Sequence, residues 1–427
     1  MRIIMYYDII IIGAGSSGLM AAVAAGKNST NVLLLDKGDK LGRKLGISGG
    51  GRCNVTNAKD IDELIKNIPG NGRFLHSSLA TFSNYDIMNF FESLGIALKE
   101  EDNGRMFPVS NKAKSVVDAL VGEVRRLGVQ IKVNSPVTKI IYKDGKVAGV
   151  KLNSGEIYHC QKVIVAVGGK SVPHTGSTGD GYAWAEEAGH TISHLFPTEV
   201  PLISREHFIA DKELQGLSLR DVTLSAWSLK GKKLITHQGD MIFTHFGISG
   251  PIVLRCSQFV VKELMKSTGT PIRVTVDLKP ELTLQEVHDE SYMLCQSDAK
   301  KMVKNVLKSF VPERMIPLLM RRANLNDEIT FDHIPKQEWL ELANLIKAFP
   351  IRIHDSLSIE EAFVTGGGVT LKEVNPSTLE SKLMSGLYFC GEILDIHGYT
   401  GGYNITAAFT TGYNAGRDAS ENLIVEQ

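Results

Sequence analysis

Cysteine is scarce in this sequence, and no two cysteines stand in a CxxC pair. There are five cysteines, an odd number that argues against a disulfide framework and against a structural zinc site. An excess of one charge is also missing, since 47 Lys and Arg residues balance 47 Asp and Glu residues. A neutral total leaves no footprint of nucleic-acid binding. We therefore expect no metal, no nucleic-acid partner and a reducing, cytoplasmic compartment.

Long apolar runs are missing as well. No stretch of about 18 apolar residues exists, so no membrane span is expected. Hydrophobic residues make up 43% and charged residues 22% of the 427 residues, which is typical of globular proteins. A chain of this length is expected to form two or three domains. The 41 glycines exceed the average and gather in short clusters, a pattern typical of backbone that lies close to a ligand.

The order of patterns along the chain predicts an α/β fold built from both chain ends. Residues 7–12 and 31–36 are predicted as strands buried on both faces, with an alanine-rich helix over 19–26 between them. Strand-like and then helix-like patterns fill the middle of the chain, and a further buried strand is expected at 387–390. The predicted parts are an N-terminal α/β part (1–195), an inserted β-rich domain (196–282), an inserted helical domain (283–347) and a return through the insert into the α/β domain (348–427).

The first chemical motif is GxGxxG at Gly13, Gly15 and Gly18, directly after the first predicted strand. The first glycine makes the tight turn, the second lets the backbone approach a pyrophosphate, and the third lets helix and strand pack closely. Asp36 ends the next strand and can accept hydrogen bonds from ribose hydroxyls. This context favours a dinucleotide site over a mere connecting turn, but the motif alone does not separate FAD from NAD.

The second motif is the glycine-rich stretch 42–57, which we expect to be an ordered loop. Its cations Arg43 and Arg52, its Asn54 amide and its free N–H groups can bind pyrophosphate and the edge of a flavin ring. The alternative is a solvated basic loop. For Cys53 we expect a packing or polar contact with the flavin, because no second cysteine lies nearby to support redox chemistry.

The third motif follows the last predicted strand. Gly391, Glu392 and Asp395 precede a glycine loop that opens a helix near residue 404. An acid here can bind ribityl hydroxyls, and the helix N-terminus can stabilise negative charge on a reduced flavin. Together with the first motif, this favours an extended FAD. Because a second GxGxxG unit is missing, NAD(P)H is expected as a diffusible reductant, unless another molecule supplies the electrons.

Four stretches resemble one known group, the bacterial BaiN-like flavoprotein family, whose members are labelled NAD(FAD)-utilizing dehydrogenases or aminoacetone-oxidase-type enzymes. The stretches are GRKLGISGGGRCNVTN (42–57), FTHFGISGP (243–251), VTGGGV (364–369) and FCGEILDIHGYTGGYNI (389–405). The resemblance runs over nearly the whole chain. It implies a fold similar to the succinate dehydrogenase and fumarate reductase flavoproteins, with a Rossmann-like FAD-binding domain and an inserted β-barrel-like and helical domain.

The resemblance also implies a set of cofactor contacts. Val137 would contact adenine through its backbone, and Asp36 stands where related flavoproteins usually carry glutamate. The implied FAD contacts are Ser16, Ser17, Asp36, Lys37, Arg43, Arg52, Asn54, Val137, Gly391 and Asp395, with Gly402, Asn404 and Ile405 at the isoalloxazine.

Flavin supplies hydride chemistry, so the protein has to place the substrate and move protons. The candidate catalytic residues are His245, His397 and Arg52; a structural role for His245, bonding the tight turn after it, is an equal alternative. Tyr399 is a similar candidate, and for Tyr399, His397 and Arg52 we favour binding or orienting the flavin over proton transfer. His174 and Asp180 are weaker candidates. We expect an FAD-dependent oxidoreductase that transfers hydride between flavin N5 and a small organic molecule, with an enone double bond as one substrate class. The alternatives are a flavoprotein that acts on RNA, which the neutral charge disfavours, and a non-catalytic FAD-binding protein.

Overall fold

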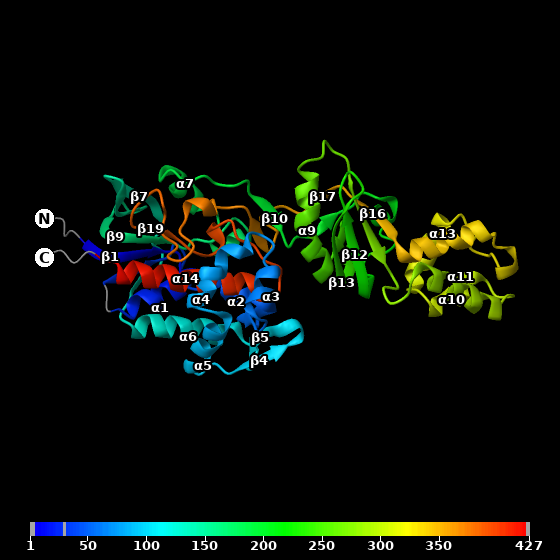
Figure 1. Ribbon diagram of the computed structural model, residues 1–427, viewed down its shortest axis with the longest axis horizontal. Helices are drawn as coiled ribbons and strands as arrows, with labels where there is room; N and C mark the ends of the chain where they lie inside the picture. The colour runs from blue at the N-terminus through cyan, green and yellow to red at the C-terminus, as the bar shows by residue number, and fades with distance from the viewer. Residues whose placement is uncertain (1–4, 29–30, 424–427) are drawn as a thin grey trace. The chain divides into compact units, whose positions relative to one another are not determined.

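The computed structural model describes residues 5–28 and 31–423, and the chain divides into two compact units (Figure 1). Unit 1 joins both ends of the chain, Met1–Phe196 and Phe363–Gln427, and unit 2 is Pro197–Ala362. The predicted α/β class with a Rossmann-like domain is confirmed. The predicted separation of a β-rich domain (196–282) from a helical domain (283–347) stays a proposal about how the insert is divided.

The central strand of unit 1 is β1 (Met5–Ile12), which lies parallel to β2 (Val32–Leu35) on one side and to β9 (Ile157–Val165) on the other. Its Ile9, Ile10 and Ile11 are fully buried because strands of a parallel sheet are covered on both faces. The strand order is β6-β2-β1-β9-β8-β7, and β19 also pairs with β9. The other strands of this sheet are β6 (Gln130–Lys132), β7 (Val137–Lys143), β8 (Lys146–Leu152) and β19 (Leu387–Phe389).

Helices α1 (Ser16–Gly26) and α14 (Tyr403–Glu421) pack side by side in unit 1 (Figure 1). Two glycines of α14 permit this approach: a Cβ on Gly412 would lie 2.2 Å from the Ser17 carbonyl oxygen, and one on Gly416 would lie 2.1 Å from that of Ala21. The last helix is thus packed onto the first. The other helices and strands of unit 1 are α3 (Ile61–Lys66), α4 (His76–Thr81), α5 (Asn84–Ser93), α6 (Ala113–Arg126), α7 (Asp180–Glu187), β3 (Thr56–Asn57), β4 (Leu98–Glu101), β5 (Arg105–Pro108) and β18 (Val364–Gly366); β10 (Phe196–Thr198) lies where unit 1 passes into unit 2.

The glycine-rich stretch that the sequence analysis assigned to a loop contains a short, kinked helix, α2 (Arg43–Gly51), so that prediction is wrong for these residues. Gly42 adopts a left-handed φ of +65° and accepts a hydrogen bond from the Gly46 N–H at 2.8 Å. The buried Leu45 side chain anchors the first turn. Left-handed glycines then end the regular helix, which is why the pattern did not indicate it.

Unit 2 contains a seven-stranded sheet with the order β16-β15-β12-β13-β14-β11-β17. Its centre is the hairpin of β12 (Ser218–Trp227) and β13 (Lys233–Phe243). The edge strands β16 (Phe349–Ile353) and β17 (Asp355–Ser356) are separated in the chain by His354 alone. The sheet must therefore curl until its edges approach, which makes it barrel-like, as predicted. The other strands are β11 (Leu202–Ile203), β14 (Gly247–Ser249) and β15 (Ile272–Asp277).

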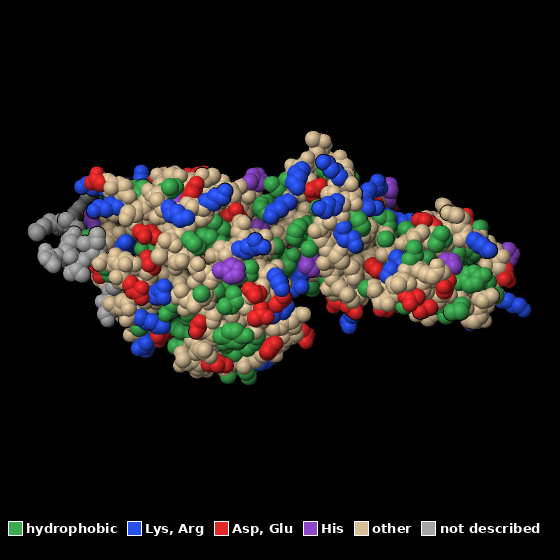
Figure 2. Space-filling view, viewed as in Figure 1, with side chains coloured by type: hydrophobic (Ala, Val, Ile, Leu, Met, Phe, Trp, Pro, Cys, Tyr) green, Lys and Arg blue, Asp and Glu red, His purple; other side chains and the backbone are tan. Residues whose placement is uncertain are grey.

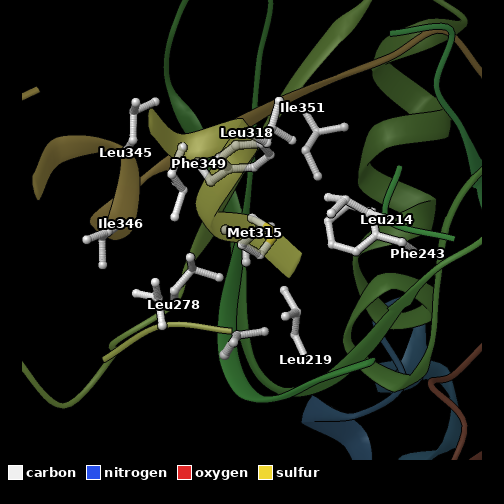
Figure 3. Close-up of a cluster of buried hydrophobic side chains, with 14 of the residues drawn as sticks. Leu214, Leu219, Phe243, Leu278, Met315, Leu318, Leu345, Ile346, Phe349 and Ile351 are labelled. Carbon is white, nitrogen blue, oxygen red and sulfur yellow. The ribbon is translucent and has the colours of Figure 1, made fainter. Parts of the chain in front are cut away.

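One hydrophobic core joins the strands and helices of unit 2. Figure 3 shows Phe243 and Phe349 from the sheet in the same cluster as Met315, Leu318 and Ile346 from the helical segment. The helices are α8 (His207–Ala210), α9 (Pro251–Leu264), α10 (Leu284–Ser297), α11 (Val303–Val306), α12 (Ile316–Arg322) and α13 (Lys336–Lys347). Among the helices built from residues 5–28 and 31–423, none combines the length and the hydropathy needed to cross a bilayer.

Candidate functional site

The glycine turn after β1 has the geometry that phosphate binding requires. Gly13 adopts φ +98°, and a Cβ there would lie 2.6 Å from the Ala166 carbonyl oxygen. A Cβ on Gly18 would lie 1.8 Å from the Gly13 carbonyl oxygen, so this position is closed to any other residue. A Cβ on Gly15 would meet no atom within 4 Å. The turn is therefore tightly packed behind and open in front, where α1 begins, and an anion can approach there.

Asp36 connects the end of β2 to this turn. Its Oδ2 accepts a hydrogen bond from the Ala14 N–H and its Oδ1 accepts one from the Gly38 N–H, each at 2.7 Å. A carboxylate has about four acceptor positions, so two bonds leave capacity for ribose hydroxyls. Asp36 also lines a cavity of about 570 Å³ in unit 1. The shorter acid that stands in place of glutamate is thus held at the cavity by the backbone itself.

The walls of this cavity are mostly polar and come from three stretches of the chain. Lys37 Nζ donates to Thr178 Oγ1 and pairs with Asp180 Oδ2 at 2.6 Å, while Arg43 pairs with Asp39. The lining residues are Asp36, Lys37, Gly38, Asp39, Arg43, Asn134, Pro173, His174, Thr175, Gly176 and Thr178. The structure therefore brings the predicted Asp36, Lys37 and Arg43 together.

The sequence patterns did not predict that residues 173–178 line the nucleotide site, although His174 within them is one of the weaker catalytic candidates. The signal that could have found them is their place after β9, at the carboxyl end of the central sheet, where ligands of such sheets bind. Val137 does not line the cavity, but Asn134 does, and its N–H donates to the Gly38 carbonyl at 2.9 Å.

The far end of the α2 stretch provides an open backbone surface. Gly49, Gly50 and Gly51 have φ values of +55°, +69° and +83°. A Cβ on Gly50, Gly51 or the earlier Gly46 would meet nothing within 4 Å. Successive left-handed residues turn their N–H groups toward one side, which suits an electron-rich ring edge or an anion. The glycine backbone therefore leaves an open space that side chains at these positions would fill.

Asn54 places an unused acceptor at the same end of the site. The side chain is buried, and its Oδ1 has no hydrogen-bond partner among the residues that the structure describes. It lies 3.1 Å from the position that a Cβ on Gly402 would take. A buried acceptor without a partner is costly unless a ligand donates to it. A flavin ring carries such an N–H donor, so the residues present fit this cofactor.

Arg52 and Cys53 beside Asn54 are both constrained. Arg52 Nη1 bonds both carboxylate oxygens of Glu101, at 2.9 and 3.1 Å, and its guanidinium lies 4.1 Å from the centre of the Phe107 ring. The Arg52 side chain, followed by Lys99, lowers the pKa of Glu101. Arg52 is therefore a fixed positive charge and a poor proton donor. Burial raises the pKa of the Cys53 thiol to about 12, so this thiol is not a nucleophile near neutral pH.

Two predicted residues from opposite chain ends meet at the start of α1. A Cβ on Gly391 would lie 2.5 Å from Ser17 Oγ, and Ser17 Oγ donates to the Cys390 carbonyl at 3.4 Å. Ser16 is the first residue of α1, next to the open face of Gly15. The N-terminal and C-terminal motifs therefore meet at the start of α1, and their joint binding of FAD stays a prediction.

Glu392 lies in an internal network. Its carboxylate pairs with Lys44 Nζ at 2.6 Å, accepts from Ser171 Oγ at 2.9 Å and accepts from the Thr365 N–H at 2.8 Å. Burial opposes the charge, but the Lys44 ammonium and these hydrogen bonds outweigh it, so the pKa of Glu392 lies below its ordinary value. Glu392 thus joins its own segment to those of Lys44, Ser171 and Thr365. Its contact with the flavin stays a prediction.

The start of α14 completes this end of the site. Gly402 adopts φ +97°, and a Cβ there would lie 2.6 Å from the Thr56 carbonyl oxygen. The Asn404 side chain closes the preceding loop, since its Oδ1 accepts from the Gly398 N–H at 2.7 Å and its Nδ2 donates to the Gly398 carbonyl at 2.9 Å. Asp395 and Ile405 are half-buried. The glycine-rich stretch and the C-terminal motif thus converge at Gly402.

The candidate histidines lie in different surroundings. The His397 side chain is 2% exposed, and its ring occupies the place that a Cβ on Gly70 would need. His245 belongs to unit 2 and is exposed beside the Phe246 ring. The tight turn at this point is bonded by Thr244 Oγ1, which accepts from the N–H groups of Phe246 and Gly247, so the alternative role for His245 falls to its neighbour.

Comparisons with known proteins agree with this geometry. The model of the HI0933-like protein Rossmann domain matches residues 7–418. The 3-dehydro-bile acid delta(4,6)-reductase of Clostridium scindens is 32% identical over 422 residues, which cover 96% of this chain and 98% of that protein. A ribosomal RNA dihydrouridine synthase of Haemophilus influenzae is 33% identical over 410 residues, which cover 96% of this chain and 97% of that protein.

A solved structure shows the shared fold. The open conformation of a flavocytochrome c3 fumarate reductase superimposes with a TM-score of 0.54 at 18% identity, covering 99% of this chain and 79% of that one. The resemblance drawn from the four motifs is thereby confirmed, including its relation to the fumarate reductase flavoproteins. The chain belongs to the HI0933-like Rossmann family of FAD-binding oxidoreductases.

Proposed function

We propose that the protein is an FAD-dependent reductase of carbon–carbon double bonds conjugated to a carbonyl group. The observation that carries this is the pair of relatives that match over nearly the whole chain. The name of one describes reduction of delta(4,6) double bonds in a 3-dehydro bile acid, and the name of the other describes formation of dihydrouridine. Both names describe saturation of a double bond that a carbonyl group polarises, although one substrate is a lipid and the other a nucleoside.

The residues of unit 1 would hold the cofactor in a defined order. The open face at Gly15 takes the pyrophosphate, and Asp36 with Lys37 takes the adenosine ribose. Asn54 and the start of α14 at Gly402 take the ring. When bound, FAD would supply a hydride at N5 for transfer to the β carbon of the conjugated system, and the α carbon would take up a proton from solvent. The protein's own part is to hold the fixed positive charge of Arg52 and the N-terminal end of α14 where negative charge develops.

The test is anaerobic stopped-flow spectroscopy of the FAD-loaded protein. NADH and NADPH are offered separately as diffusible reductants, and the reduced flavin is then mixed with a 3-oxo-4-ene steroid, cyclohexenone or the matching saturated ketones. We expect reoxidation by the conjugated compounds and none by the saturated ones. The proposal is overturned if the protein takes up no FAD, or if the reduced flavin reacts equally with saturated and unsaturated ketones.

A second candidate is reduction of uridine within RNA. The relative from Haemophilus influenzae favours it, and so does the β12–β13 hairpin of unit 2, whose turn region carries Lys230, Lys232 and Lys233. The two candidates share the conjugated double bond and differ only in what carries it. Mass spectrometry of nucleosides from RNA incubated with the reduced protein separates them, because dihydrouridine carries two more hydrogens than uridine. If the reduced flavin reacts with neither ketones nor RNA, both candidates fail.

A further inference from the structure

The turn of the β12–β13 hairpin carries lysines that the flavin site does not use. Lys230, Lys232 and Lys233 are all exposed. The turn is ordered by its own backbone, since the Ser228 N–H donates to the Lys232 carbonyl at 2.7 Å and Gly231 adopts φ +77°. The three ammonium groups therefore project from a fixed scaffold.

Trp227, at the end of β12, positions two further charges. Lys233 Nζ lies 5.3 Å from the centre of its ring, and the Arg273 guanidinium lies 4.7 Å from it. The indole N–H donates to Thr275 Oγ1 at 3.0 Å, which fixes the ring on the sheet. Lys233, Trp227 and Arg273 stand on the neighbouring strands β13, β12 and β15. Two cations held against one ring lose less conformational entropy when they bind an anion.

The end of α9 lies against the turn and adds another cation. Glu263 accepts from the Leu229 N–H at 3.0 Å and pairs with Lys266 at 3.1 Å. The Leu229 bond, Lys266 and, at longer range, Lys230 lower the pKa of Glu263. We define the basic hairpin surface as Lys230, Lys232, Lys233, Lys266 and Arg273, with Glu263 as the carboxylate among them. Figure 2 shows Lys and Arg side chains gathered over the strands and helix α9 of this unit.

We infer that the basic hairpin surface binds the phosphodiester backbone of an RNA strand. This extends the proposed function in its second form, the reduction of uridine in RNA. Lys233 on β13 and Arg273 on β15 flank Trp227 on β12, so the cations span a stripe of about 10 Å, because neighbouring strands lie roughly 4.8 Å apart. Lysine supplies point charges and arginine supplies a planar fork, and both match phosphate oxygens. The chain is neutral as a whole, so this concentration of charge is local.

An acidic membrane would meet the same charges but needs apolar anchors as well. The turn and the end of α9 expose two large apolar side chains, Leu229 at 44% and Met265 at 49%. Trp227 cannot insert, because its N–H is bonded and cations lie over its ring. Two aliphatic side chains beside lysines give marginal anchoring to a bilayer. The surface therefore fits a polyanion in water better than a lipid headgroup layer.

The test compares two charge-reversed variants of the FAD-loaded protein. The K230E/K232E/K233E variant changes the basic hairpin surface, and K143E/K146E/K151E changes exposed lysines at the β7–β8 hairpin by the same total charge. Binding to a fluorescein-labelled, uridine-rich single-stranded RNA is followed by anisotropy at several salt concentrations. We expect at least a tenfold loss of affinity for the first variant, and a log–log salt slope smaller by about 2. The control should stay within about twofold of the natural protein.

The outcomes separate the surface from the proposed chemistry. Equal RNA binding by both variants, no RNA binding by the natural protein, or hairpin-dependent binding to phosphatidylserine vesicles instead of RNA would each overturn the inference. Both variants should reduce cyclohexenone at the natural rate and show the natural flavin spectrum, which establishes that they fold. If the natural protein binds RNA through the hairpin but reduces neither enone nor uridine, the surface stands and the proposed function fails.

Discussion

At the scale of single residues, Asp36 serves the fold and the nucleotide site together. Its carboxylate holds the glycine turn through Ala14 and also lines the cavity. We expect Asp36→Ala to weaken FAD binding by roughly 10- to 100-fold, since hydrogen bonds to a charged group contribute about 1.5–3 kcal/mol. Titration of the apoprotein with FAD, followed by flavin fluorescence, measures this. Asp8→Ala is the matched control, because Asp8 lies in the middle of β1, away from the glycine turn, and accepts from the Asn31 N–H at 2.8 Å. Equal affinity of Asp36→Ala and the natural protein would refute the ribose assignment.

At the scale of elements, the contact between α1 and α14 depends on the absence of side chains. A Cβ on Gly412 would strike the Ser17 carbonyl at 2.2 Å, and backbone cannot move aside cheaply. We expect Gly412→Ala to lower the thermal midpoint of flavin release by several degrees, because overpacking costs about 1–3 kcal/mol. Gly122→Ala in α6 is the control: its Cβ would meet nothing within 4 Å, so the midpoint should stay equal or rise slightly. A fall as large in the control would refute the packing argument.

The Lys44–Glu392 pair connects elements that are distant in the sequence, and its effect depends on pH. The folded pKa of Glu392 lies below its ordinary value of about 4.3. The stability that the charged Glu392 side chain contributes to the folded protein is therefore complete at pH values above about 4.3. It is lost as the pH falls through the lowered pKa of the folded state. We expect Glu392→Gln to lower the midpoint of flavin release by roughly 4–8 °C at pH 7, since it leaves the Lys44 ammonium without its carboxylate.

The difference in the midpoint of flavin release between Glu392→Gln and the natural protein should disappear as the pH falls below about 4.3. Melting curves taken across a pH series measure this difference. Glu187→Gln removes the exposed pair with Lys139, 3.8 Å apart, and should change the midpoint by no more than about 2 °C. A gap that is independent of pH down to the lowest measurable value would contradict the assignment of the effect to the Glu392 charge.

At the scale of the whole molecule, the flavin unit needs both chain ends. Strand β19 pairs with β9 from Leu387 onward, and α14 packs on α1. A chain that ends at Gly386 keeps the GxGxxG motif but loses both elements. We expect it to carry no flavin absorbance after purification and reconstitution. A chain that ends at Asn422, just beyond α14, should bind FAD normally. Stoichiometric FAD in the shorter chain would refute the two-ended site.

The sequence predicted the parts of the site that local patterns encode. The GxGxxG turn, Asp36 and the start of α14 are recognisable because glycine spacing and strand ends lie within a few residues of one another. The Lys37–Asp180 pair joins residues 143 positions apart, and no local pattern reports such a contact. The partners of Glu392 and the cavity wall at 173–178 were missed for the same reason. The kinked helix α2 was missed because its glycines resemble a loop and only the buried Leu45 anchors it.

The insertion of unit 2 between the two parts of unit 1 sets an order of events during synthesis. Every residue of Pro197–Ala362 leaves the ribosome before Phe363 does. Unit 2 can therefore bury its core while unit 1 still lacks strand β19 and helix α14. The nascent chain has to keep the first part of the flavin unit from misfolding or aggregating until β19 and α14 have been made. We therefore expect cofactor capture only after the whole of unit 2 has been made, even though the GxGxxG motif precedes unit 2 in the chain.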